Sequence, residues 1–138
     1  MIRALLVLLA AASPAAAQVG PLSFDAGKSL PLASGQWSYA PTATGGEARF
    51  GAHLSIRCDK PTRTITIGRP GMPVAALTIA TDMLTRALPP NGRISAYDPL
   101  LDAMAFSRGR FLVSGGTGPV LAVPSWPEAA RAIEDCRN

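Results

Sequence analysis

The chain has two cysteines, and their positions constrain its fold more than any other feature of the sequence. Cys136 lies two residues from the carboxyl terminus, in the stretch AIEDCRN, whereas Cys58 lies far upstream in LSIRCDK. A disulfide between them would close a loop over more than half of the chain and fix the tail to the body. Whether the thiols are joined depends on the compartment, because disulfides persist where conditions are oxidising.

The amino terminus has the three-part pattern of a secretory signal peptide. Arg3 supplies the positive charge, an apolar run follows from Ala4 to Ala12, and Ala15-Ala16-Ala17 provides the small residues of a cleavage site. The run of nine apolar residues is shorter than the roughly 20 that cross a bilayer, which disfavours the alternative of an N-terminal membrane anchor. We therefore predict a signal peptide over residues 1–17, a periplasmic or secreted location, and no membrane span after cleavage.

Export favours a disulfide between Cys58 and Cys136, with two buried free thiols as the alternative. Two cysteines and one histidine fall short of the usual tetrahedral ligand set of zinc, and the cysteines lack the Cys-x-x-Cys spacing of a redox pair. The sequence therefore predicts no metal site and no cofactor.

Side-chain direction indicates that the two thiols can meet. On a strand, alternate residues share a face, and here one face carries Ala52, Leu54, Ile56 and Cys58. On a helix at the tail, a stripe that starts at Trp126 passes through Ile133 and ends at Cys136. We expect this helix to pack on the sheet, and the chain-entropy model gives about 4.5 kcal/mol for closing the loop.

The body of the chain alternates short β-type runs with turn residues. After a lead-in over residues 18–35, predicted to be extended, we expect strands within 36–40, 47–58, 63–69, 74–82 and 92–98, and a hairpin over 110–124. The stretch 83–91 fits a short helix or a strand equally well. Asp98 before Pro99 predicts one helix start, and the capping-box spacing of Ser125 and Glu128 predicts another.

These elements predict one α+β domain over residues 36–138. We expect a twisted antiparallel β-sheet or a partly open barrel of about six or seven strands, with one short helix and a C-terminal helix.

The sequence carries no recognisable catalytic set. His53 is the only histidine, and no motif surrounds it. Asp98 and Asp102 are better explained as a helix cap and a first-turn residue than as a glycosidase pair. The stretch SGGTG lacks the Gly-Lys-Ser/Thr ending of a phosphate-binding loop. We predict no catalytic residue, which favours a protein that is not an enzyme.

The most suggestive polar cluster is SRGR, in which Arg108 and Arg110 flank Gly109. Two guanidinium groups could bind a carboxylate or phosphate, which makes these arginines candidate anion-binding residues. The alternative is a helix C-terminus where cations offset the dipole before a glycine stop. The remaining cations are scattered and aromatic residues make up 6% of the chain, so we predict no nucleic-acid partner.

The run from Tyr97 to Arg137, together with LSIRC, resembles small uncharacterised exported proteins of alphaproteobacteria. The signal peptide, Trp37 and the β-rich body are similar, more distantly, to invasion-associated locus B-like periplasmic proteins, which carry more cysteines. The resemblance implies export and assigns no functional residues. We predict a non-enzymatic periplasmic or secreted module that binds an unknown protein or cell-envelope component. The alternative is a small envelope hydrolase or an inhibitor of a cell-wall hydrolase.

Overall fold

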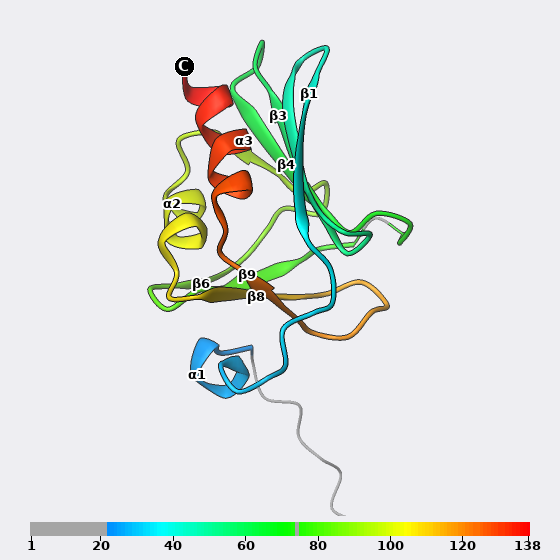
Figure 1. Ribbon diagram of the computed structural model, residues 1–138, viewed down its shortest axis with the longest axis vertical. Coiled ribbons are helices and arrows are strands. Elements are labelled where there is room, and N and C mark those ends of the chain that lie inside the picture. The colour runs from blue at the N-terminus through cyan, green and yellow to red at the C-terminus, as the bar shows by residue number, and fades with distance from the viewer. Residues whose placement is uncertain (1–21, 74) are drawn as a thin grey trace, which may run out of the picture.

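The computed structural model describes residues 22–73 and 75–138, which form two antiparallel sheets and three helices (Figure 1). The first sheet has the order β1-β2-β3-β4-β7, with β1 Trp37–Thr42, β2 Gly45–Phe50, β3 Leu54–Asp59, β4 Thr64–Gly68 and β7 Arg93–Ser95. The second sheet has the order β6-β5-β8-β9, with β5 Thr78–Ala80, β6 Thr85–Ala87, β8 Arg110–Ser114 and β9 Leu121–Pro124. The helices are α1 Phe24–Gly27, α2 Pro99–Phe106 and α3 Pro127–Arg137.

This architecture confirms the predicted fold class, an antiparallel α+β protein with a short internal helix and a C-terminal helix. The described residues form nine strands in two open sheets, which is more than the six or seven expected. One reason is that the stretch 47–58, predicted as a single strand, is a hairpin. Gly51 has a φ of 52° and turns the chain between β2 and β3. A second reason is that the undecided stretch 83–91 contains β6, which pairs with β5.

The two sheets differ in how their faces are covered. Strands β2, β3 and β4 alternate between buried and accessible residues, because one face meets the core and the other does not. Strands β8 and β9 are buried almost throughout, because the second sheet has the main core on one side and Leu22 with α1 on the other. The first sheet therefore presents a polar outer face, whereas the second does not.

The predicted lead-in over residues 18–35 needs a correction within its described part. Phe24–Gly27 is one turn of helix rather than extended chain, because the Ser23 hydroxyl caps it by accepting a hydrogen bond from the Ala26 N–H at 3.2 Å. The predicted signal peptide, residues 1–17, and residues 18–21 lie outside the described residues.

The predicted start of α2 is confirmed, and that of α3 is corrected. Asp98 caps α2, and its Oδ1 accepts a hydrogen bond from the Leu100 N–H at 2.9 Å. The capping box of Ser125 and Glu128 is wrong, because the N-cap position falls on Trp126, one residue later. The Ser125 hydroxyl and one Glu128 oxygen are instead buried with no partner among the described residues.

The C-terminal helix is joined to the first sheet as predicted (Figure 1). The disulfide Cys58–Cys136 links β3 to the last turn of α3, with a Cα–Cα distance of 5.5 Å. The buried stripe of α3 comprises Ala129, Ala132, Ile133 and Cys136. It starts later than expected, because Trp126 is 45% exposed.

Two glycines make this close approach possible. A Cβ on Gly45 would lie 2.7 Å from the Cys58 sulfur, and a Cβ on Gly46 would lie 2.5 Å from the Tyr39 hydroxyl. That hydroxyl donates a hydrogen bond to Asp135 of α3, and this contact raises the pKa of Tyr39 above its usual value. Glycines at the start of β2 thus let α3 lie directly on the sheet.

Candidate functional site

Strand register gathers polar side chains on the outer face of the first sheet. Glu47, Arg57, Thr66 and Arg93 are successive partners across β2, β3, β4 and β7. Arg49 and Ser55 form the neighbouring row across β2 and β3. Partners in register project from the same face, so three arginines and two hydroxyls meet there.

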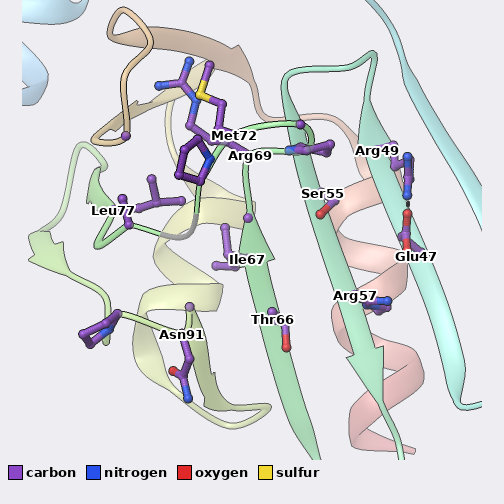
Figure 2. Close-up of a pocket in the computed structure, with 18 residues that line it drawn as sticks. Glu47, Arg49, Ser55, Arg57, Thr66, Ile67, Arg69, Met72, Leu77 and Asn91 are labelled. Atoms are coloured by element: carbon purple, nitrogen blue, oxygen red, sulfur yellow. Dashed lines mark hydrogen bonds and ion pairs between the residues drawn. The ribbon is translucent and has the colours of Figure 1, made fainter.

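A cleft of about 300 Å³ opens beside this face (Figure 2). Arg49, Ser55 and Arg57 lie on one side, while Ile67, Met72 and Leu77 lie on the other. The apolar side is completed by the described residues Pro70, Pro73, Ala75 and Pro90. The volume is at the small end of the range that ligand pockets occupy.

Arg69 fixes one wall of this cleft. Its side chain is buried, and its Nη1 donates hydrogen bonds to the carbonyls of Gly115 at 2.9 Å and Pro119 at 3.0 Å. Burial lowers the pKa of Arg69 from its usual value, because desolvation disfavours the charged form. The two hydrogen bonds join the segment after β4 to the β8–β9 turn. Gly116 of that turn also lines the cleft.

The arginines of the outer face differ in how they are paired. Arg49 forms an ion pair with Glu47, and Arg93 lies 3.7 Å from Asp59. Arg57 is exposed on the central strand, and the described residues give its side chain no ion pair and no hydrogen bond. Its donors face solvent beside the cleft, where an anion could reach them.

The predicted anion-binding residues, Arg108 and Arg110, lie at a different place. They line a depression together with residues of α1 and of the β5–β6 turn. Arg108 is 3.5 Å from Asp82, and Arg110 donates a hydrogen bond to the carbonyl of Leu30. The structure brings the two arginines to one depression but gives each a partner within the chain, so anion binding there stays a prediction.

The other polar residues singled out in the sequence have structural surroundings. His53 lies in the β2–β3 turn, with its ring centroid 6.3 Å from that of Phe50. Asp102 forms an ion pair with Arg137 at 2.8 Å. Asp98 caps α2 and also accepts a hydrogen bond from Arg86 at 2.6 Å.

Sequence reasoning did not bring Arg49 and Arg57 together. The signal was present in the alternation of EARF and LSIRC, which puts each arginine opposite its apolar neighbours. Using it required the Gly51 turn, because that turn makes the two stretches adjacent strands with Glu47 opposite Arg57.

Comparisons with family models, curated proteins and solved structures found no match to this chain. Within residues 22–73 and 75–138, no three side chains of His, Cys, Asp or Glu are placed to hold a metal ion. No helix in that part of the chain is both long and apolar enough to span a bilayer.

Proposed function

We propose that this chain is a non-enzymatic periplasmic or secreted module that binds a protein or cell-envelope component through the outer face of its first sheet. The observation that carries the proposal is Arg57, an exposed guanidinium without a partner in the described chain, beside a cleft with an apolar wall. Cationic groups of this kind recognise carboxylates and phosphates, which acidic proteins and envelope components carry.

The chemistry of the cleft supports binding rather than catalysis. Its polar groups are mainly guanidiniums and hydroxyls, and the carboxylate of Glu47 is held by Arg49. A guanidinium stays protonated, so it holds an anion well but does not exchange protons as a general acid or base. The buried disulfide supports the proposed location, because such bonds persist in oxidising compartments.

Affinity capture tests the proposal. The immobilised protein is exposed to an envelope extract from an alphaproteobacterium, in parallel with Arg57→Gln and with the control Lys60→Gln. Lys60 is exposed just beyond the C-terminal end of β3 and does not line the cleft, so the control removes the same charge outside it. We expect components that the unmodified protein and the control retain and that Arg57→Gln loses. Equal retention by all three proteins would refute the outer face as the binding surface.

A further inference from the structure

We infer that the cleft binds a small amphiphilic anion, in which a phosphate or carboxylate group is attached to an apolar chain. The inference rests on the proposed function, because it names the chemistry of the component that the outer face recognises. It is carried by the side-by-side placement of a cationic wall and an apolar wall in one cleft (Figure 2).

The cationic wall suits the anionic end of such a ligand. Arg57 offers a forked set of donors, and the hydroxyls of Ser55 and Thr66 project from the same face beside it. Arg49 and Arg93 add positive charge, so the three arginines exceed the two carboxylates paired with them, Glu47 and Asp59. The outer face therefore has a cationic surplus centred on β3.

The apolar wall suits the other end of the ligand. Pro70, Pro73 and Pro90 are partly or fully exposed and have no backbone N–H, whereas Leu77 and Ile67 are almost fully buried and belong to the core. Met72 is partly exposed at this wall, and a thioether side chain adapts to irregular apolar groups. An inorganic anion would leave this wall unused, whereas a neutral amphiphile would leave Arg57 without a partner.

The size of the cleft favours a small ligand over a protein segment. About 300 Å³ is the scale of a small-molecule site, whereas a stable protein interface covers about 800 Å² on each partner. Arg69 acts as a positioning residue, because its hydrogen bonds to the β8–β9 turn fix the apolar wall before any ligand arrives.

Titration calorimetry with four probes tests the inference: decyl phosphate, decanoate, decyl maltoside and inorganic phosphate, with each amphiphile kept below its micelle concentration. We expect the protein and the control Lys60→Gln to bind decyl phosphate or decanoate. Arg57→Gln should weaken that binding at least tenfold, because a charge-assisted hydrogen bond contributes that much. Met72→Gln should weaken it too, while inorganic phosphate and decyl maltoside bind poorly.

Each contrary outcome has a defined meaning. Equal binding of decyl maltoside, or an unchanged affinity of Arg57→Gln, would overturn the anionic part of the inference. Equal binding of inorganic phosphate, or an unchanged affinity of Met72→Gln, would overturn the apolar part. If no amphiphile binds but Arg57→Gln still loses its partners in affinity capture, the inference fails and the proposed function stands. If both experiments fail, both proposals fall. Arg57 is exposed, so its variant should keep an unchanged melting temperature, which verifies folding.

Discussion

Asp98 shows how several contacts on one carboxylate set its chemistry. Burial by itself raises the pKa of this group, because desolvation disfavours the charged form. The hydrogen bond from Arg86, the hydrogen bond from the Leu100 N–H and the positive charge of Arg86 outweigh that effect. The pKa of Asp98 is therefore below its usual value, so the charged form of this carboxyl contributes to the stability of the folded chain.

Asp98→Asn should destabilise the protein in a pH-dependent way. Asparagine also caps helices, so the change removes mainly the charge that faces Arg86, at a cost of up to about 1 kcal/mol near neutral pH. A carboxyl whose pKa is lowered on folding stabilises the native state above its unfolded pKa of about 3.9, and this contribution is lost as the pH falls through the folded pKa. Urea denaturation at several pH values measures the difference. If the difference in the free energy of unfolding between the two proteins did not narrow below about pH 4, this account would be contradicted.

At the scale of elements, Arg69 couples two connecting segments. Arg69→Met keeps an apolar stem of similar length but leaves the carbonyls of Gly115 and Pro119 without their donor. We expect a loss of about 2 kcal/mol in the free energy of unfolding, the usual range for hydrogen bonds to a charged group. The matched control is Arg57→Met, which should change stability by less than about 0.5 kcal/mol because Arg57 is exposed. Chemical denaturation measures both values. Equal losses in the free energy of unfolding for the two variants would show that the hydrogen bonds of Arg69 to the β8–β9 turn do not stabilise the fold.

Elements with their own chemical signals could be predicted from the sequence. Asp98 and Pro99 mark the start of α2, and the apolar stripe that ends at Cys136 defines α3 and its disulfide. The β2–β3 turn could not be predicted, because Gly51 gives a weak local signal inside a continuous β-type run. Strand β6 could not be predicted either, because it has only three residues and forms by pairing with β5. The candidate cleft was missed for the same reason, because it exists only after the strands are in register.

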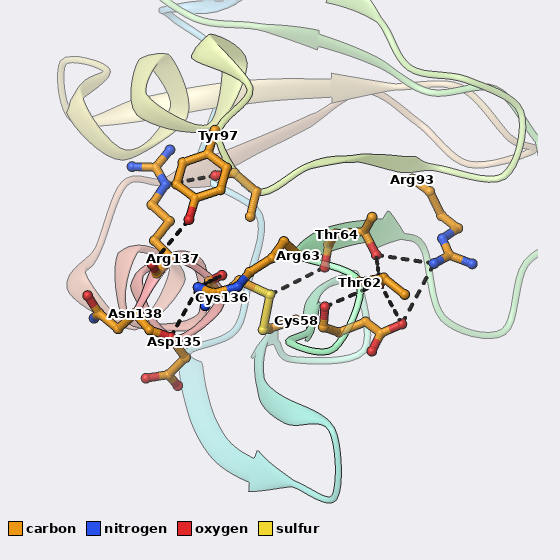
Figure 3. The surroundings of a disulfide bond; sticks show 12 residues. Cys58, Thr62, Arg63, Thr64, Arg93, Tyr97, Asp135, Cys136, Arg137 and Asn138 are labelled. Atoms are coloured by element: carbon orange, nitrogen blue, oxygen red, sulfur yellow. Dashed lines mark hydrogen bonds and ion pairs between the residues drawn. A yellow bond between two sulfur atoms is a disulfide. The ribbon is translucent and has the colours of Figure 1, made fainter.

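At the scale of the whole molecule, the disulfide and the polar contacts of the last residues attach the end of α3 to the rest of the chain (Figure 3). Cys58 and Cys136 are 78 positions apart, and the loop that they close contains the whole second sheet and α2. The tail has further contacts around this bond. Arg63 donates hydrogen bonds to the carbonyls of Cys136 and Asn138, and Arg137 donates one to the carbonyl of Ala96 and forms an ion pair with Asp102.

These contacts predict a graded response to changes at the tail. Replacing both cysteines with alanine should cost about 2–4 kcal/mol, because the unfolded chain regains the freedom of a long loop. Truncation after Glu134 should cost more than that, by about 1–3 kcal/mol, because it also removes Asp135, the partner of Tyr39, and Arg137, the partner of Asp102. Urea denaturation without reductant measures both losses. Reduction of the unmodified protein is the control, and it should reproduce the alanine variant. If the truncated protein were no less stable than the cysteine variant, the polar contacts of the last four residues would contribute nothing, and the disulfide would account for their whole effect on stability.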